Sequence, residues 1–553
     1  MLCDQYREYL RLVIYQIYPR SFMDSNGDGV GDLNGIREKL DYLKDLGVNA
    51  VWLCPCYKSP NDDNGYDISD YRDIMDEFGT MADMDALIAA LHERGMKLIM
   101  DLVPNHTSTA HPWFQASRRE KDGPYGNYYY WFDEPPNDWK SVFRGSAWEF
   151  DPVRGQYYLH SFAVSQADLN WNEPGVRREM ADIVDFWINK GVDGFRIDVI
   201  DMISKDLTGD RNGFGPRLHE FIRELIGGER SARIFTVGES GVKDLDEMIR
   251  HCAAEREELS TLFLFDHMGC GRSDKFTPKK DSLKTLRDCL IRWQKETAEH
   301  DLLHSLFTDN HDQPPMISRI ADDRERRYES ATCMAAMVYL LKGIPFIYQG
   351  QEIGMTAARY DSIECFDDVE TVNAYREFVK TMPPDKALEK INFGSRDNAR
   401  RPMAWNGGRN GGFTEGQPWI PLHSRVREIN AEKDRAAELS VYRFYRALLK
   451  LRRKEAAFLD GKTEVLSSPD DPYFIYTRTL GSEKWAVVCN FGAEQNIALP
   501  FKCEKPALAN LERTAADGLY APYECAAAKV VTGRQKKGAV AETQKSAAAP
   551  FPG

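Results

Sequence analysis

The 553-residue sequence predicts an α/β protein: a (β/α)₈ TIM barrel with an inserted loop-rich domain after the third strand and a C-terminal antiparallel β-domain. Three observations support this fold class. Apolar runs of strand length alternate with amphipathic stretches of helical spacing. One long segment rich in Trp, Tyr, Pro and Gly interrupts the alternation. From about residue 460, the strand–helix alternation gives way to short runs in which apolar and polar residues alternate, a pattern typical of antiparallel strands.

Each predicted barrel strand is a short run rich in Val, Ile, Leu and aromatic residues. The eight runs are 12–18, 50–54, 97–103, 192–199, 233–238, 261–266, 303–309 and 343–349. The amphipathic stretches between them include 33–46, 83–94, 176–190, 281–297 and 328–342. Several of these stretches end at a glycine just before the next strand, as helices commonly do.

The breaks in this alternation predict the domain boundaries. We expect the barrel to comprise residues 1–106 and 173–459. Residues 107–172 replace the helix after the third strand and would form a substrate wall over the strand C-termini. Residues 460–531 are expected to form a small β-sandwich. Residues 532–553 are rich in Ala, Lys, Gln and Pro, a composition typical of a disordered tail.

Composition and charge restrict the partners and the compartment. The chain has 72 basic and 86 acidic residues, a net charge of −14, and no long basic run, which argues against a nucleic-acid or membrane partner. The charged N-terminus lacks the apolar stretch of a signal peptide, and no apolar run reaches the ~20 residues of a membrane span. The odd number of cysteines, 11, is typical of reduced thiols. We therefore expect a cytoplasmic protein, either a monomer or a weak homo-oligomer.

Three of the predicted strands end at a carboxylate. These are Asp198 in GFRIDV, Glu239 in IFTVGES and Asp312 in LFTDNHD, with Arg196 and His311 beside them. The C-terminal ends of all strands in a parallel barrel meet at one mouth. Cleavage of a glycosidic bond needs one carboxylate as nucleophile or base and another as proton donor. The pattern therefore predicts a glycosidase site.

Eight motifs in order extend this hypothesis. They are YQIYPRSF, DLVPNH (101–106), QADLNW (166–171), GFRIDV (194–199), VGE (237–239), NHDQ (310–313), GIPFIYQG (343–350) and RDNARRPMAW (396–405). With them, about residues 10–530 resemble the α-amylase superfamily (glycoside hydrolase family 13), and within it the oligo-1,6-glucosidase/α-glucosidase branch. The resemblance implies a retaining mechanism with Asp198 as nucleophile, Glu239 as acid/base, and Asp312 as a third carboxylate that binds sugar hydroxyls.

The chemistry of the two reacting carboxylates must differ. Arg196 lies two residues before Asp198 on one strand, so both side chains point to the same face, where the guanidinium would keep Asp198 ionised. Glu239 must instead hold a proton at neutral pH, which requires burial or nearby negative charge.

The resemblance also implies the residues of a one-glucose pocket. His106 and His311 would donate hydrogen bonds to the hydroxyls of one glucose. Asp63 would bind its 4-hydroxyl and Tyr66 would stack on its ring. Arg400 would pair with Asp63, close the pocket behind that glucose and make the enzyme exo-acting. The alternatives are Asp62 and Asp67 for the aspartate and Arg396 for the arginine.

The segment DSNGDGVGD places oxygen ligands at every second position. The expected ligands are Asp24, Asn26, Asp28, the carbonyl of Val30, and Asp32. This alternation resembles a calcium loop, although Gly35 stands where an EF-hand has its glutamate. The glucosidase branch carries a structural Ca²⁺ at such a loop, and the alternative is an Asx-rich turn. No organic cofactor is expected.

Val199, directly after the predicted nucleophile, indicates the linkage. In this branch a valine there accompanies α-1,6 bonds, and Ala or Thr accompanies α-1,4 bonds, but trehalose-6-phosphate hydrolases also have valine. Strand packing is the alternative explanation. The chain departs from the branch pattern at Ala167, Pro315 and Ala404, on the acceptor side.

The sequence thus predicts a retaining exo-acting α-glucosidase that hydrolyses α-1,6 bonds of isomalto-oligosaccharides from the non-reducing end. A trehalose-6-phosphate hydrolase, an α-1,4-glucosidase and a sucrose-acting or transglucosylating enzyme are the alternatives. A non-catalytic amylase-like transporter subunit would lack the three carboxylates and carry a membrane anchor.

Overall fold

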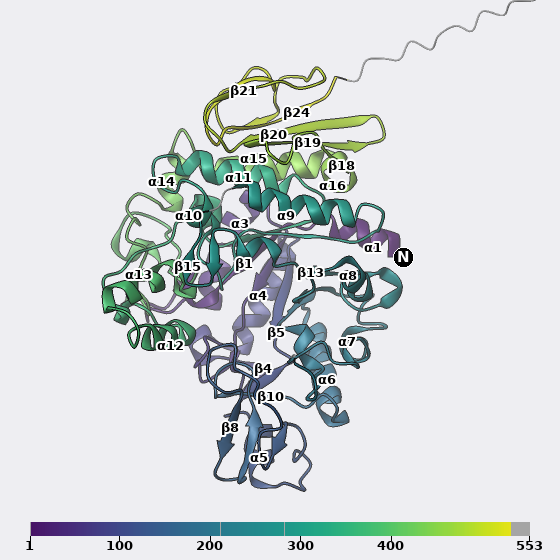
Figure 1. The fold of residues 1–553 in the computed structure, drawn as a ribbon, viewed down its shortest axis with the longest axis vertical. Helices are drawn as coiled ribbons and strands as arrows, with labels where there is room; N and C mark the ends of the chain where they lie inside the picture. The colour runs from purple at the N-terminus through teal and green to yellow at the C-terminus, as the bar shows by residue number, and fades with distance from the viewer. Residues whose placement is uncertain (1, 211, 281–282, 532–553) are drawn as a thin grey trace, which may run out of the picture.

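The computed structural model describes residues 2–210, 212–280 and 283–531 (Figure 1). Its centre is an eight-stranded parallel sheet in the order β13-β12-β11-β5-β2-β1-β17-β16. A parallel bridge between Leu262 and His304 joins the first and last strands, so the sheet closes into a barrel. The strands are β1 (Ile14–Ile17), β2 (Ala50–Leu53), β5 (Lys97–Leu102), β11 (Gly194–Ile197), β12 (Phe235–Glu239), β13 (Thr261–Phe263), β16 (Ser305–Leu306) and β17 (Ile344–Tyr348). The predicted fold class is confirmed.

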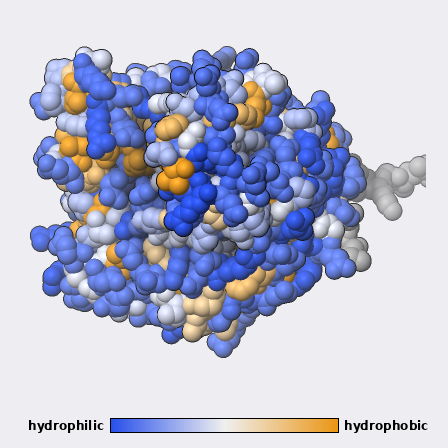
Figure 2. Space-filling model, turned by 90° about the horizontal axis from the view of Figure 1, so that it is seen from below, coloured by the Kyte–Doolittle hydropathy of each residue, from blue (hydrophilic) through white to orange (hydrophobic). Residues whose placement is uncertain are grey.

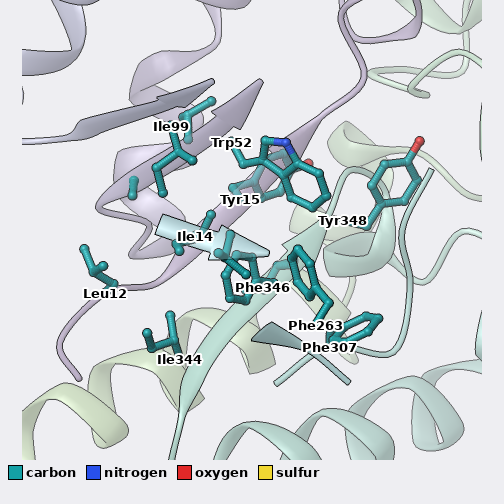
Figure 3. Close-up of a cluster of buried hydrophobic side chains, with 14 of the residues drawn as sticks. Leu12, Ile14, Tyr15, Trp52, Ile99, Phe263, Phe307, Ile344, Phe346 and Tyr348 are labelled. Atoms are coloured by element: carbon teal, nitrogen blue, oxygen red, sulfur yellow. The ribbon is translucent and has the colours of Figure 1, made fainter. Parts of the chain in front are cut away.

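Aromatic and aliphatic side chains pack together in the core around the barrel strands (Figure 3). The ring of Phe263 lies 5.4 Å from Trp52, 5.0 Å from Phe307 and 4.8 Å from Phe346, with tilted or edge-on geometry. Because the strands are covered on both faces, by this interior and by the outer helices, their sequences are continuously apolar rather than alternating. This packing holds the strand ends, and the side chains that follow them, in fixed positions.

The outer helices follow the predicted stretches with small differences. They are α2 (Leu33–Glu38), α3 (Leu40–Leu46), α4 (Met81–Glu93), α6 (Pro174–Lys190), α7 (Leu218–Ile226), α8 (Leu245–Cys252), α9 (Leu283–Glu296) and α11 (Arg327–Tyr339). The single helix expected over 33–46 is two helices, because Lys39 leaves the helical conformation at φ −100° and ψ 2°. Gly47 and Gly191 end α3 and α6 in the left-handed conformation, as predicted.

The insertion lies between β5 and α6 and projects from one end of the molecule (Figure 1). It contains β6 (His106–Ser108), α5 (Pro112–Arg119), β7 (Trp131–Phe132), β8 (Trp148–Asp151), β9 (Gln156–Leu159) and β10 (Gln166–Asp168). It has a small core of its own around Tyr130, Trp139 and Trp148. Antiparallel pairing of β6 with β10 brings its two ends together at the barrel mouth. Seen from this end, the surface is mostly hydrophilic with separate apolar clusters (Figure 2).

A five-stranded antiparallel sheet covers the opposite end of the molecule (Figure 1). Its strands are β18 (Lys462–Val465), β19 (Tyr473–Leu480), β20 (Glu483–Asn490), β24 (Cys525–Lys529) and β22 (Leu508–Ala509), and β21 (Gln495–Ile497) pairs with β23 (Gly518–Tyr520) beside it. The Tyr476 hydroxyl donates to the Ala336 carbonyl of α11 at 3.2 Å, which attaches the sheet to the barrel. The predicted tail, 532–553, lies outside the described residues.

The remaining elements connect and cover the barrel. The helices are α1 (Leu2–Tyr9), α10 (Met316–Ile320), α12 (Val369–Phe378), α13 (Pro384–Gly394), α14 (Ala431–Ala436), α15 (Val441–Lys454) and α16 (Ala456–Asp460). The short strands are β3 (Tyr57–Lys58), β4 (Asp70–Ile74), β14 (Arg272–Asp274) and β15 (Thr277–Pro278). Among residues 2–210, 212–280 and 283–531, none of the helices has the length and apolar character needed to cross a membrane.

Candidate active site

Arg196 on β11 binds three carboxylates at once. Its Nη1 lies 2.8 Å from Asp101 Oδ1 and 2.6 Å from Asp198 Oδ1, and its Nη2 lies 2.6 Å from Glu239 Oε2. The three carboxylates come from β5, from the end of β11 and from β12, which are neighbours in the barrel. In this register Arg196 stands beside Asp101 and Val237, so one guanidinium reaches all three. The structure thus brings Asp198 and Glu239 together, as predicted from the strand ends.

Burial separates the protonation states of the two predicted catalytic carboxylates. It raises the pKa of Asp198 to about 6 and that of Glu239 to about 8, although Arg196 acts to lower both. The negative charges of Asp198 and Asp312 raise the pKa of Glu239 further. At neutral pH Glu239 therefore holds a proton while Asp198 is largely ionised. This is the division of roles that a proton donor and a nucleophile require.

Asp312 is held ionised on the other side of the mouth. Its Oδ1 lies 2.9 Å from Arg400 Nη2 and 3.4 Å from Arg396 Nη1, and its Oδ2 lies 3.1 Å from His311 Nε2. Burial opposes ionisation, but His311 and the two guanidiniums hold the pKa of Asp312 well below its usual value. Since burial lowers the pKa of His311 to about 3, the imidazole is neutral at pH 7 and the arginines supply the positive charge.

His311 links Asp312 to the first cluster. Gln16 Nε2 donates to His311 Nδ1 at 2.8 Å, which leaves the proton of the imidazole on Nε2. His311 Nε2 lies 2.6 Å from the Tyr66 hydroxyl, which donates in turn to Asp101 Oδ2 at 3.0 Å. The Tyr66 and His311 rings also stack, with centroids 5.4 Å apart. Hydrogen bonds therefore join His311 to Asp101 through Tyr66, and the same His311 Nε2 lies 3.1 Å from Asp312 Oδ2.

Arg396, and not Arg400, pairs with Asp63. Arg396 Nη2 lies 2.9 Å from Asp63 Oδ1, whereas Arg400 donates to the His311 carbonyl at 3.0 Å and to Asp312. The predicted pairing of Arg400 with Asp63 is therefore wrong. Asp368 holds Arg396 in position, because it accepts from Arg396 Nε at 2.8 Å. Burial raises the pKa of Asp63 even though Arg396 acts to lower it.

The insertion contributes a second hydrogen-bonded link. Gln166 on β10 lies 3.1 Å from Asp63 Oδ2 and 3.2 Å from His106 Nε2 through its side-chain amide. The Phe162 ring lies 5.1 Å from His106, and the Arg396 guanidinium lies 4.8 Å from the Phe143 ring. Aromatic side chains of the insertion therefore stand beside the Asp63–Arg396 pair.

Of the rival aspartates, Asp67 supports the loop. Its carboxylate accepts hydrogen bonds from the backbone N–H groups of Asp62 and Asp63 at 2.9 and 3.0 Å. Burial raises the pKa of Asp67 to about 6. Asp63 is thus the aspartate of this loop that reaches Arg396 and Gln166.

Val199 adopts an unusual backbone conformation. Its φ is 36° and its ψ is 47°, a left-handed conformation that is rare for a β-branched residue. Its N–H lies 3.3 Å from Glu239 Oε2, and its side chain is half-buried at the strand end. Backbone strain at this position therefore accompanies a direct contact with the predicted proton donor.

Sequence reasoning missed several members of this network. They are Gln16, Asp101, Gln166 and Asp368, and Arg396 was kept only as an alternative. Asp101 opens the motif DLVPNH, but it lies inside the apolar run 97–103 and not at its end, so the signal that revealed the other carboxylates was absent for it. Asp368 lies outside every motif, and only its contacts with Arg396 reveal it.

The predicted calcium loop folds around its own side chains. Asp24 Oδ1 accepts from the N–H groups of Asn26 and Gly27 at 2.9 and 2.7 Å, and Asp32 Oδ2 accepts from Ser25 at 2.7 Å. Similar bonds join Asn26 Oδ1 to the Asp28 N–H and Asp28 Oδ1 to the Val30 N–H. The donor set is all oxygen, which suits Ca²⁺ chemically. The same contacts are those of an Asx-rich turn.

Comparison with known proteins identifies the family. Residues 16–461 match the family model for the alpha-amylase catalytic domain, so the chain belongs to the alpha-amylase family and is a glycoside hydrolase. It is 49% identical over 504 residues to an oligo-1,6-glucosidase of Parageobacillus thermoglucosidasius, which covers 87% of this chain and 89% of that protein. It is 41% identical over 524 residues to a trehalose-6-phosphate hydrolase of Bacillus subtilis, with 90% and 92% covered.

Comparison with solved structures also places the chain in the alpha-amylase family. A trehalose-6-phosphate hydrolase of Bacillus licheniformis superposes with a TM-score of 0.88 and 39% identity, over 95% of this chain and 100% of that one. An isomaltulose synthase of a Klebsiella species superposes with a TM-score of 0.90 and 38% identity, over 95% and 99%. The predicted membership of the α-amylase superfamily is confirmed.

Proposed function

We propose that this protein is a retaining, exo-acting α-glucosidase that hydrolyses the α-1,6 bonds of isomaltose and isomalto-oligosaccharides from the non-reducing end. The observation that carries the proposal is the pair Asp198 and Glu239 on one guanidinium, the first largely ionised and the second protonated at neutral pH.

In the first step, a carboxylate oxygen of Asp198 attacks the anomeric carbon while Glu239 gives its proton to the leaving glycosidic oxygen. The bond to the leaving sugar breaks and a glucosyl–Asp198 ester forms. Glu239, now ionised, takes a proton from water, whose oxygen attacks the anomeric carbon and releases Asp198. Two inversions give net retention.

The rest of the network binds one glucose. Asp312, ionised beside Arg396 and Arg400, accepts hydrogen bonds from sugar hydroxyls, and His106 and His311 donate to others. The Asp63–Arg396 ion pair closes the pocket behind that glucose, in the role that the sequence predicts for Arg400. A pocket closed on this side supports exo action.

The linkage preference rests on Val199 and on relatives. Val199 directly follows Asp198, is half-buried, and its N–H lies 3.3 Å from Glu239 Oε2. An isopropyl group there favours the longer α-1,6 bond and crowds the α-1,4 bond. The oligo-1,6-glucosidase of Parageobacillus thermoglucosidasius, 49% identical, supports the same substrate class.

One observation favours a second candidate, trehalose 6-phosphate. The residues that line a cavity of about 1150 Å³ include Pro314, which follows Asp312 by two positions in the sequence. Six basic residues line it, against three acidic ones: Arg319, Arg324, Arg359, Lys386, Lys390 and Arg425 against Asp323, Asp361 and Glu389. An excess of positive charge in this cavity suits a phosphorylated sugar.

Initial rates at equal concentrations of isomaltose, maltose, sucrose, trehalose and trehalose 6-phosphate test both candidates. We expect the highest kcat/KM on isomaltose, with α-glucose as the first product. A preference for trehalose 6-phosphate that Lys386→Ala and Lys390→Ala abolish would replace the first proposal with the second. Retained rates on isomaltose in the same variants serve as the control.

We further propose that loop 24–32 binds a structural Ca²⁺ through Asp24, Asn26, Asp28, the Val30 carbonyl and Asp32. The all-oxygen donor set supports this. We also propose a cytoplasmic monomer or weak homo-oligomer; the 11 cysteines, an odd number typical of reduced thiols, support the cytoplasmic location.

A further inference from the structure

Two helices of the barrel wall hold a cluster of metal-ligating side chains outside the active site. His219 lies on α7, and Glu247 and His251 lie one turn apart on α8. One ligand atom from each of the three lies within 4.8 Å of the others. The two imidazole rings are 4.7 Å apart between centroids, at an angle of 62°. Figure 1 shows α7 and α8 on the same side of the barrel.

The hydrogen bonds of both histidines leave Nε2 as the free lone pair. His219 Nδ1 lies 2.7 Å from Glu258 Oε2, and His251 Nδ1 lies 2.8 Å from the Glu247 carbonyl. Because a carboxylate and a carbonyl only accept, each Nδ1 carries the proton. A histidine whose second nitrogen donates to a carboxylate or carbonyl is typical of metal ligands.

His251 Nε2 lacks a partner. Its side chain is fully buried, and the described part of the chain offers this nitrogen no hydrogen bond. Asp201 Oδ1, at 3.7 Å, is too distant for one. A buried acceptor left unsatisfied is costly, and the ring that carries it lies 4.7 Å from the His219 ring.

We propose that His219, Glu247 and His251 bind one transition-metal dication of the zinc type. Two imidazole nitrogens with one carboxylate oxygen form a ligand set that Zn²⁺ uses, whereas Ca²⁺ and Mg²⁺ prefer oxygen alone. The side chains of His219 and Glu247 are 23% and 30% exposed, so an ion can enter and water can complete its coordination.

A bound ion would cross-link two consecutive units of the barrel, because α7 follows β11 and α8 follows β12. Asp201, whose Oδ1 lies 3.7 Å from His251 Nε2, binds the segment after the predicted proton donor, since it accepts from the Ser240 hydroxyl at 3.0 Å and from the Gly241 N–H. The expected effect is a metal-dependent gain in thermal stability through this wall.

Isothermal titration of the chelator-treated, full-length protein with Zn²⁺ alone tests the site. We expect one equivalent to bind and the unfolding temperature to rise. Glu247→Gln removes a ligand from a partly exposed position and should weaken binding at least about tenfold, and His251→Ala should weaken it further. His300→Ala, which removes an exposed histidine elsewhere, should leave the affinity unchanged.

Absence of zinc binding by the wild type would overturn the proposal. So would unchanged affinity in both Glu247→Gln and His251→Ala, because the ion would then bind elsewhere, for example at the catalytic carboxylates. If His251→Ala does not fold, Glu247→Gln decides alone. Its circular dichroism spectrum and its activity without metal should match wild type.

Discussion

Replacement of Glu239 by Gln should abolish activity and stabilise the protein at alkaline pH. Burial raises the pKa of Glu239 from an ordinary 4.5 to about 8. Between these values the folded protein keeps a proton that the unfolded chain has released. The contribution of this group to stability is therefore fully present below 4.5 and is lost as the pH rises towards 8.

The size of the effect follows from the shift. At 1.36 kcal/mol per pH unit, ionised Glu239 costs the folded state ~5 kcal/mol above pH 8. This is an upper limit, because Asp198 shares the proton balance through Arg196. The amide keeps the size of the side chain and removes one of three negative charges around that guanidinium.

Thermal unfolding of both proteins at about pH 5 and about pH 9 measures the effect of Glu239 on stability. We expect the advantage of Glu239→Gln over wild type to be small at the lower pH and large at the higher. Asp312→Asn is the matched control, and it should destabilise at both, because the lowered pKa of Asp312 means that its ionised form contributes stability above the ordinary value. An unfolding temperature of Glu239→Gln equal to or below wild type at the higher pH would refute the reasoning.

Four further outcomes are expected. Asp198→Asn should fold normally and keep less than about one thousandth of the turnover, measured with contaminating glucosidase excluded. The pH profile of kcat/KM should be bell-shaped, with limbs near 6 for Asp198 and 8 for Glu239; a flat profile over this range would contradict the assignments. A calcium chelator should lower the unfolding temperature and added Ca²⁺ should restore it; unchanged melting after full calcium removal would leave loop 24–32 an Asx-rich turn. Val199→Ala should shift the kcat/KM ratio of isomaltose to maltose about ten- to two-hundredfold towards maltose, by ~1–3 kcal/mol; a shift under about threefold would mean that the valine only packs.

The three predicted catalytic carboxylates show what the local sequence can predict. A run of consecutive apolar residues predicts a strand, and a parallel barrel places the C-terminus of every strand at one mouth. Asp198, Glu239 and Asp312 could therefore be assigned to that mouth from the sequence. The protonation states of these carboxylates could not be predicted from the sequence. The opposite pKa shifts of Glu239 and Asp312 depend on how many guanidiniums each carboxylate meets after folding.

The break between α2 and α3 is a local feature that the periodicity of the sequence does not predict. The periodicity of 33–46 is helical throughout, but the chain breaks the helix at Lys39, which carries no strong breaking signal of its own. Its ammonium lies 4.8 Å from the Trp405 ring, a contact with a residue distant in sequence. Such contacts do not appear in a periodic pattern.

The sequence by itself determined the barrel, the insertion, the C-terminal sheet and the carboxylates at the mouth, because each depends on periodicity and residue type over a few neighbours. Only the tertiary structure decided which long side chain meets which partner. Arg396 and Arg400 lie four residues apart in an irregular segment, and both could reach an aspartate. Contacts with other parts of the chain determine the pairing, since Asp368 orients Arg396 towards Asp63 while the His311 carbonyl holds Arg400 at Asp312. The same reason hides His219 and His251 from sequence analysis: they meet only because α7 and α8 pack as neighbours on the barrel wall.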